Sequence, residues 1–386
     1  MPTYTGTSAN NAWTLVAGGT FSLDGLAGTD TLYMGTSLRS SYKITQGADG
    51  SVHVDTLSGA SQPAHITLYN MEVLVFNNGR DTLDLTTYFD TTPPAIADFS
   101  GASAKGPVAP SSSLVVTFSE PVRLGSGAIS LKDAAGKVVQ TFDATSAVIS
   151  GSTLTLKPQA PLNIYTEYSL EMSAGAVNDL AGNALGAAAS LKFKTSTVDG
   201  LYHFFVVAFA AAPGVTYMGQ LADAYNYFSG LPAAAGAKSA LEQIVEIFTT
   251  KSQFTGVYPT TLSNRELATE LVSRIVKSSA SEATKASAVD DIEAALGIGW
   301  SRGKMLFTVF GNLAAKPLTD PVWGGTAKQF QNELAVARYF TETLAYDTTD
   351  LNVLRQVLDS VGPDTDVSGP TQLAQIIGSA VPPPAG

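Results

Sequence analysis

The sequence contains no cysteine, which excludes disulfide frameworks, thiolate metal sites and cysteine nucleophiles. Histidine is almost as scarce: His53, His65 and His203 are the only three, and none has the His-Glu-x-x-His spacing of a zinc helix. The Gly-x-Ser-x-Gly pattern of a serine nucleophile elbow is also missing. We therefore expect a protein that is not an enzyme and has no catalytic residues.

Basic residues are few and dispersed. The chain has 22 Lys and Arg against 33 Asp and Glu, a formal net charge of −11, and the acidic excess is spread over both halves. Without a basic patch, charge-driven binding to nucleic acid or to an anionic lipid surface is not expected. The dispersed carboxylates favour solubility and offer oxygen ligands to divalent cations.

Long hydrophobic runs are missing too. The longest, Leu201 to Ala212, is far shorter than the roughly 20 residues that span a bilayer. It predicts a buried helix and no transmembrane segment. Met1 to Gly6 has neither a basic region nor an apolar run, so no Sec-type signal is expected. Of the 386 residues, 45% are hydrophobic and only 14% are charged, which is enough for the cores of two to four domains.

The middle of the chain, residues 91–197, predicts a β-sandwich. It opens with Pro93 and Pro94, which hold their surroundings extended and mark a linker. Short β-type runs follow, separated by Gly, Pro, Asp, Asn and Ser, and about seven strands in about a hundred residues favour an immunoglobulin-like fold. The expected strands are Ile96–Phe99, Leu114–Phe118, Ala128–Leu131, Val138–Phe142, Leu154–Leu156, Tyr168–Met172 and Leu191–Phe193.

Four motifs occur in order within this stretch. Together they resemble the bacterial Ig-like domains that are repeated in S-layer proteins and large adhesins, and the resemblance covers most of residues 92–195. It implies an extracellular spacer or assembly module. The motifs are Phe118-Ser119-Glu120-Pro121-Val122, Gly127-Ala128-Ile129-Ser130-Leu131, Leu154-Thr155-Leu156-Lys157-Pro158 and Val177-Asn178-Asp179-Leu180-Ala181-Gly182-Asn183.

Polar side chains within these motifs suggest a cation site. Glu120, Asp179 and Asn183 fall at loop positions, and oxygen-rich loops at the end of a sandwich can gather around calcium. The alternative is local turn formation, because Asn and Asp bond their own backbone and Gly182 permits a positive φ. Both interpretations stay open at this stage.

Residues 1–90 are rich in β-type sequence. Within Leu23 to Leu32, Gly25 and Gly28 allow a tight turn and Asp30 can supply a hard oxygen ligand, the pattern of the glycine-aspartate nonapeptides that wind a calcium-loaded β-roll. Only one degenerate copy is present, and such sites take ligands from neighbouring turns. The single copy therefore favours a plain turn over a calcium site at Asp24 or Asp30.

Further motifs in this part suggest a family. Asp49-Gly50 lies between two alternating runs and predicts a hairpin, and an apolar run follows at Asn70–Phe76. With Arg39–Tyr42, these features resemble the short β-module that accompanies RTX calcium-binding repeats in proteins exported by type I secretion, over residues 20–86. The resemblance implies export through an uncleaved C-terminal signal, which would account for the missing Sec signal.

The N-terminal segment Ala12–Ala17 carries no charge and lies beside Gly18 and Gly19. Two outcomes are open for its residues Trp13, Leu15 and Val16. They can pack within their own β-domain, which is the favoured outcome. Alternatively, the segment can add as a strand to the sheet edge of the next subunit and so drive assembly.

After Thr195 the apolar period changes from two to 3.6 residues, which predicts an all-helical domain of seven or eight helices over residues 198–386. One helix, Leu351–Leu358, is expected to begin after Thr349 or Asp350 as cap. The segments Leu267–Gly311 and Asn332–Glu342 resemble helical domains of type I-secreted surface proteins, including the cell-anchoring region of some Gram-negative S-layer proteins. Some members of that group bind lipopolysaccharide.

The sequence therefore predicts a β-then-α multidomain protein: a β-rich RTX-associated module (1–90), an Ig-like β-sandwich (91–197) and an all-helical domain with a C-terminal secretion signal (198–386). We expect a secreted, non-catalytic cell-surface protein that self-assembles into an S-layer, sheath or filament, with calcium as a bound ion. The alternative is an adhesin or anchoring module that binds lipopolysaccharide or another surface glycan.

Overall fold

The computed structural model describes residues 1–16, 18–57, 64–232 and 237–380. The chain forms two compact units. The first comprises Met1–Lys105, Ser113–Gln159 and Tyr168–Lys192, and the second comprises Gly106–Ser112, Ala160–Glu167 and Phe193–Gly386.

The N-terminal strands wind as a parallel coil. In one sheet β3 pairs in parallel with both β1 and β7, and in the other β4 pairs in parallel with both β2 and β8. Thr5 lies opposite Asp24, and Ala12 lies opposite Thr31, so equivalent positions in the first two turns are 19 residues apart. The strands of this coil are β1 (Thr3–Thr5), β2 (Ala12–Thr14), β3 (Gly19–Asp24), β4 (Thr31–Tyr33), β7 (Ala64–Tyr69) and β8 (Val73–Phe76).

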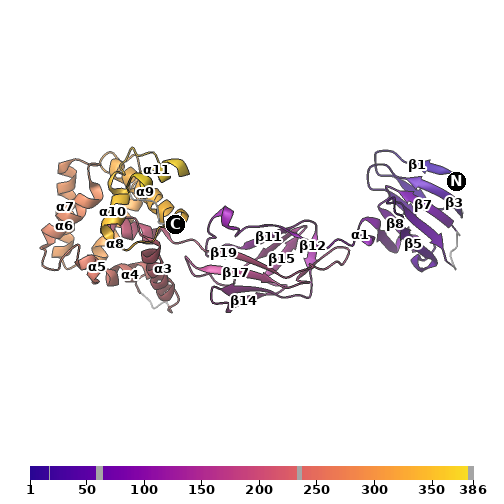
Figure 1. The fold of residues 1–386 in the computed structure, drawn as a ribbon, viewed down its shortest axis with the longest axis horizontal. Coiled ribbons are helices and arrows are strands. Elements are labelled where there is room, and N and C mark those ends of the chain that lie inside the picture. The colour runs from indigo at the N-terminus through magenta and orange to yellow at the C-terminus, as the bar shows by residue number, and fades with distance from the viewer. Residues whose placement is uncertain (17, 58–63, 233–236, 381–386) are drawn as a thin grey trace. The chain divides into compact units, whose positions relative to one another are not determined.

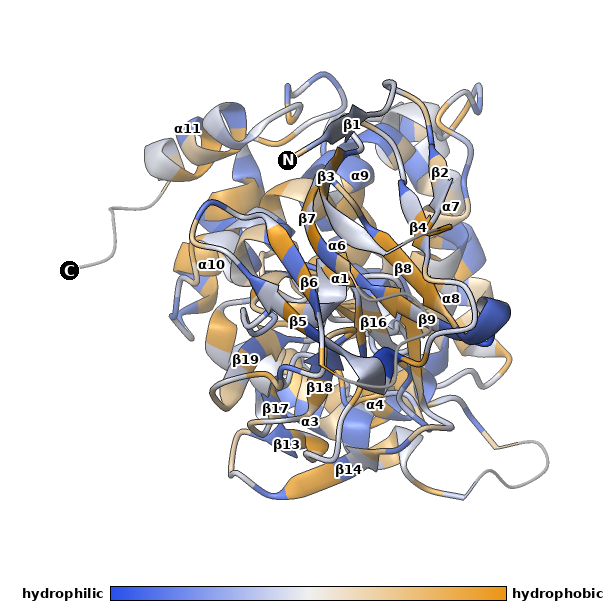
Figure 2. Cartoon of the chain, turned by 90° about the vertical axis from the view of Figure 1, so that its right-hand side faces the viewer, coloured by the Kyte–Doolittle hydropathy of each residue, from blue (hydrophilic) through white to orange (hydrophobic). Residues whose placement is uncertain are grey.

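Antiparallel strands complete both sheets. β5 (Tyr42–Gln46) and β6 (Val52–Thr56) form the hairpin predicted around Asp49-Gly50, and β6 also pairs with β7. β9 (Asp81–Asp84) pairs with β8 and leads into the short helix α1 (Leu85–Tyr88). The wholly apolar β8 is visible in Figure 2, and it belongs to the core of this domain.

The next strands form the predicted sandwich. Its sheets have the orders β10-β11-β16-β15 and β14-β13-β17-β19, and β12 pairs with β18. All seven expected strands are present, and β12, β15 and β18 are additional. Strands β11, β12, β14, β15, β17 and β19 are labelled in Figure 1. The strands are β10 (Ile96–Phe99), β11 (Leu114–Phe118), β12 (Val122–Leu124), β13 (Ile129–Asp133), β14 (Val138–Phe142), β15 (Ala147–Ser150), β16 (Thr153–Leu156), β17 (Glu167–Met172), β18 (Val177–Asp179) and β19 (Ala189–Lys194).

Helices follow the sandwich, which confirms the β-then-α order. Ten α-helices form within the described residues from Asp199 onward, more than the seven or eight expected. The helices are α2 (Asp199–Phe209), α3 (Val215–Ser229), α4 (Ala240–Phe248), α5 (Ser252–Thr255), α6 (Asn264–Val276), α7 (Glu282–Gly297), α8 (Arg302–Ala314), α9 (Gly324–Arg338), α10 (Leu351–Asp359) and α11 (Pro370–Ala380), with a π-helical turn at Tyr339–Thr343.

Two local predictions for the helices are confirmed. The apolar run from Leu201 lies in α2, whose phenylalanines are fully buried. Asp350 caps α10, because its side chain accepts a hydrogen bond from the Asn352 N–H. Across the described parts of the chain, no helix combines the length and apolarity needed to cross a bilayer.

Candidate metal centre

Three carboxylates meet where the sandwich begins. Asp90 follows α1, Glu120 lies in the turn between β11 and β12, and Asp179 ends β18. Because β12 pairs with β18, Val122 lies opposite Asp179, and Glu120 comes only two residues before Val122. One oxygen from each of the three side chains lies within 4.8 Å of the other two.

Asp179 is the fixed point of this group. It is only 1% exposed, and its Oδ1 accepts hydrogen bonds from the Gly182 N–H (2.6 Å) and the Asn183 N–H (2.7 Å). The Asn183 amide nitrogen donates to Asp179 Oδ2 (2.9 Å) and to the Asp90 carbonyl oxygen (2.8 Å). Asn183 therefore positions Asp90 against Asp179 through its NH₂ group, and Gly182 makes this turn with a φ of 101°.

The electrostatics of the group favour a bound cation. Burial raises the pKa of Glu120, and the charges of Asp90 and Asp179 raise it further. Among the described residues, no lysine, arginine or histidine forms an ion pair with any of the three. Hard oxygen ligands without nitrogen or sulfur suit calcium or magnesium. These residues could hold such an ion.

The structure thus gathers Glu120, Asp179 and Asn183 in one place, as the sequence suggested. It adds Asp90, which the sequence analysis did not name as a ligand. Its position directly before the proline-rich linker was a signal in the sequence. In the structure, the Thr92 N–H donates a hydrogen bond to Asp90 Oδ1 (2.8 Å). The turn into the linker therefore holds the Asp90 carboxylate in place.

Asp24 and Asp30 lie elsewhere, at a corner of the N-terminal coil. Asp24 Oδ1 accepts from the Leu26 N–H (3.1 Å) and from the Asn70 amide nitrogen (2.8 Å). The group of three carboxylates identified among the described residues includes neither aspartate. Calcium at this corner stays a prediction, and the observed contacts are those of a turn.

Asn11, Asp30 and Glu72 form a column that crosses the coil, in which Asp30 is buried and the other two are partly exposed. Asp30 Oδ1 accepts from the Asn11 N–H (2.7 Å) and from the Asn11 amide nitrogen (2.8 Å). Its own N–H donates to Glu72 Oε2 (2.7 Å). The Asp30 and Glu72 side chains therefore each accept a backbone N–H from the preceding turn of the coil. The sequence reasoning missed the column, although the pairs Gly6 and Gly25, and Asn11 and Asp30, recur at the 19-residue spacing.

The N-terminal segment lies in its own domain. Trp13 is in β2, which pairs with β4, and Leu15 is 4% exposed in the core. Val16 projects, with 82% of its surface exposed. Trp13 and Leu15 therefore pack within their own domain and Val16 does not, and strand addition by the segment stays a prediction.

Comparison with known proteins identifies one part of the chain. Residues 90–195 match the bacterial Ig-like domain family. The matched range includes Asp90, Glu120 and Asp179, so the whole carboxylate group lies in the Ig-like domain. No curated protein matches the sequence.

Two solved structures show distant similarity. One is the chitinase ChiW of Paenibacillus sp. str. FPU-7, described as a cell-surface-expressed multi-modular enzyme, with 12% identity over 49% of this chain and a TM-score of 0.17. The other is a polysaccharide lyase, with 8% identity over 74% of this chain and a TM-score of 0.17. The chain spans 15% and 46% of those proteins, respectively.

Proposed function

We propose that this protein is a non-catalytic structural component of a bacterial cell surface that associates with copies of itself into a layer, sheath or filament. The Ig-like domain supports a surface location. The RTX-like motifs, taken with the parallel coil, support type I export through a C-terminal signal. Self-association rests on one structural observation, the outer edge of the sandwich at β14.

β14 ends its sheet and offers an uncharged apolar edge. Val138 and Val139 are each 49% exposed, although neighbouring residues of a regular strand point to opposite faces. A bulge explains this: Lys132 pairs with Val138 and Leu131 pairs with Gln140, which leaves Val139 unpaired. Exposed strand edges without charge or proline favour pairing with another chain.

The charges that flank β14 favour a second copy as the partner. Lys137 precedes the strand and Asp143 follows it. In a two-fold antiparallel arrangement centred on Gln140, Lys137 of one copy faces Asp143 of the other. Hydrogen bonds from the Thr145 and Ser146 side chains lower the pKa of Asp143 to about 2, so it is ionised at neutral pH. Such a contact is self-complementary, as a two-fold interface requires.

Sedimentation velocity tests this edge. Wild-type protein should form larger species as its concentration rises, and Val139→Lys should shift the distribution to monomer because a charge would be buried at the contact. Val148→Lys is the matched control, since Val148 is 62% exposed on β15, an edge strand of the other sheet. Association of Val139→Lys equal to that of wild type would exclude β14 as the contact.

The proposal also gives a role to the carboxylates of the metal centre. We propose that calcium bound by Asp90, Glu120 and Asp179 fastens the start of the Ig-like domain, because Asp90 belongs to the connection with residues 1–89 and the other two belong to the sandwich. An ion there would reduce the freedom of the connection. A stiffer subunit loses less conformational entropy when it joins an assembly.

A further inference from the structure

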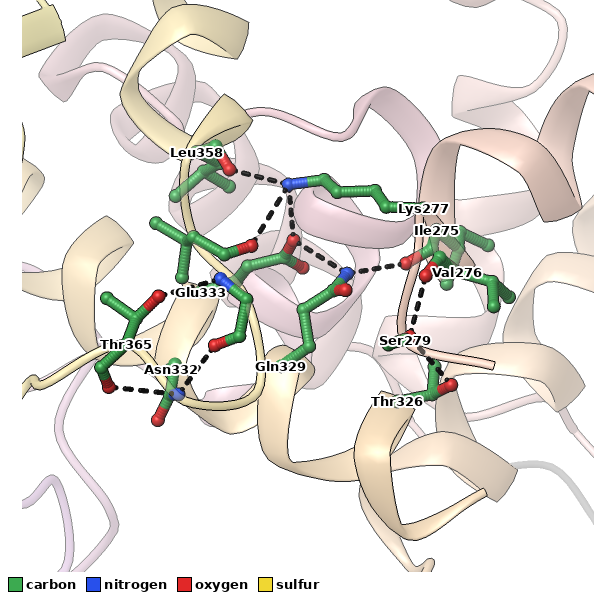
Figure 3. A network of polar contacts seen from close by, with 12 residues as sticks. Ile275, Val276, Lys277, Ser279, Thr326, Gln329, Asn332, Glu333, Leu358 and Thr365 are labelled. Atoms are coloured by element: carbon green, nitrogen blue, oxygen red, sulfur yellow. Dashed lines mark hydrogen bonds and ion pairs between the residues drawn. The ribbon is translucent and has the colours of Figure 1, made fainter. Parts of the chain in front are cut away.

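A buried polar group lies near the ends of α6 and α10 (Figure 3). A second group lies one helical turn earlier along both helices. Lys277, just after α6, places its Nζ 2.8 Å from the buried carboxylate of Glu333 and donates to the Leu358 carbonyl oxygen at the end of α10 (2.5 Å). Gln329 also donates to Glu333 (3.0 Å). This cation therefore has a carboxylate partner and carbonyl partners.

The second group is less completely paired: Arg355 Nε donates to the Phe209 carbonyl oxygen (3.0 Å) and Arg274 Nη2 lies 3.4 Å from Glu270 Oε2, but other donors of the group have no partner among the described residues. Arg274 precedes Lys277 by three residues and Arg355 precedes Leu358 by three residues, a spacing that places each pair on one helical face. Tyr258, which precedes α6 in the chain, is fully buried. Tyr258 Oη, Arg274 Nε and Arg355 Nη2 are all buried atoms, and none has a hydrogen-bond partner among the described residues.

These three donors belong to one locality. The Arg274 guanidinium lies 5.9 Å from the centre of the Tyr258 ring. The charges of both arginines act on the Tyr258 phenol, and the charge of Arg274 acts on Arg355. Arg302 approaches from α8 and donates to the carbonyl oxygens of Tyr258 (2.7 Å) and Pro259 (3.0 Å).

Positive charge exceeds negative charge here. Arg274 reaches Glu270 at 3.4 Å, and the charge of Asp359 acts on Arg355. No ion pair to Arg302 or Arg355 is formed within the described residues. Burial raises the pKa of Tyr258 to about 12, so its hydroxyl keeps its proton and remains a donor at neutral pH.

We propose that Tyr258, Arg274 and Arg355 form a binding site for an oxyanion of the phosphate class. Unpaired buried donors are costly, and a phosphate oxygen can accept hydrogen bonds from a hydroxyl and from guanidinium groups together. The Arg274 side chain keeps 33% of its surface exposed, which gives an anion access from solvent. Tyr258 then supplies the buried donor and the two arginines supply charge.

The same chemistry fits inorganic phosphate and a phosphate group carried by a surface sugar. The site lies in the helical part and uses neither the carboxylates of the metal centre nor β14. A test of phosphate binding at this site is therefore independent of calcium binding and of self-association. A sugar-borne phosphate would give the helical domain a role in holding the protein to a phosphorylated glycan.

Melting curves of the full chain test the proposal. Inorganic phosphate, added at constant ionic strength against chloride, should raise the melting temperature with a saturable dependence, because it binds only the folded state. Arg355→Gln and Arg274→Gln should each weaken phosphate binding at least tenfold. Arg265→Gln is the matched control, since Arg265 forms exposed ion pairs with Asp290 and Glu293, and its phosphate response should equal that of wild type.

The variant Tyr258→Phe tests whether the Tyr258 hydroxyl binds phosphate or has only a structural role. Without phosphate, this variant should be as stable as wild type or more stable, since it removes an unpartnered buried hydroxyl. With phosphate, it should gain less than wild type. Equal gains in wild type and Tyr258→Phe, or a wild-type melting temperature that follows only ionic strength, would overturn the proposal.

Mannose 6-phosphate distinguishes the two sources. Tighter binding than inorganic phosphate indicates a sugar-borne phosphate, and equal binding indicates the free ion; both outcomes support an oxyanion site. Where a variant melts too low for comparison, isothermal titration calorimetry at low temperature measures the same affinities. Absence of binding heat for both ligands with wild-type protein would also reject the site.

Discussion

Glu120 and Asp179 place carboxylate oxygens within 4.8 Å of each other, and Asp90 lies within the same distance of both. Three like charges at this spacing repel one another unless a proton or a cation intervenes. The backbone around them is nevertheless fixed, because Asp179 accepts two N–H groups and Asn183 joins Asp179 to Asp90. The folded chain therefore preforms the group before any ion arrives.

Calcium should stabilise the folded protein by mass action. An ion that binds only the folded state adds about 2.7 kcal/mol at a hundredfold excess over its dissociation constant. We expect a higher melting temperature in millimolar calcium than in chelator, measured by differential scanning calorimetry. Indistinguishable curves, with no calcium found by elemental analysis, would remove Asp90, Glu120 and Asp179 as ligands.

Glu120→Gln should have opposite effects with and without calcium. The folded-state pKa of Glu120 is raised, so its contribution to stability is present below its unfolded pKa and is lost as pH rises through the folded pKa. At neutral pH in chelator, removing this charge should therefore raise the melting temperature. In calcium the variant should lose most of the wild-type gain.

Asp223→Asn is the matched control for that experiment, because Asp223 is exposed on α3 and belongs to the other compact unit. It removes one negative charge without touching the metal centre. It should leave both melting temperatures close to wild type. A calcium response of Glu120→Gln equal to that of this control would show that Glu120 does not bind the ion.

Glu333 should make stability depend on pH. Burial raises its pKa to about 7, although Lys277 and Gln329 oppose the shift. Since the folded pKa exceeds the ordinary 4.5, this group's contribution is fully present below about pH 4.5 and is lost as pH rises through about 7. The loss is on the order of 3 kcal/mol.

Urea unfolding of wild type and Glu333→Gln across this range measures the effect. The difference between the two free energies of unfolding should change with pH, because the variant cannot ionise there. Asp223→Asn again serves as control and should follow wild type. A constant difference between wild type and Glu333→Gln would contradict the raised pKa.

The sandwich could be predicted because its strands alternate strongly and its turns carry Gly, Asp and Asn. The strands β12 and β18 escaped prediction, since each has only three residues and too short a pattern to show a period. The parallel coil escaped for another reason. Its paired strands are separated in sequence by a full turn of the coil. The pattern of any one strand therefore does not indicate which strand it pairs with.

Some residues of the candidate sites could be predicted from the sequence, and others could not. Glu120, Asp179 and Asn183 could be named because they stand in turn-forming motifs. Asp90 directly precedes the linker, but its approach to Glu120 depends on the tertiary path of the chain, which the sequence does not show. Glu333 lies beside the apolar stripe of Phe330 and Leu334 on α9. The burial of the Glu333 side chain could not be predicted from the sequence, because its partner Lys277 comes from the end of a different helix.

The proposed C-terminal export signal needs a truncation that preserves the fold. Removing residues 330–386 would delete Phe330, Leu354 and Val357, which are at most 1% exposed, so loss of export would then report unfolding. In α11, only Ile377 is buried. We expect removal of residues 370–386 to abolish export while cooperative melting is retained. Normal secretion of this shorter truncation would place any signal elsewhere.

Self-association is the central claim, and negative-stain electron microscopy of the purified full chain tests it most directly. Grids prepared in millimolar calcium should show ordered layers or filaments, and grids prepared in chelator should show fewer or shorter ones. Single particles of monomer size at every protein concentration, with and without calcium, would contradict the account.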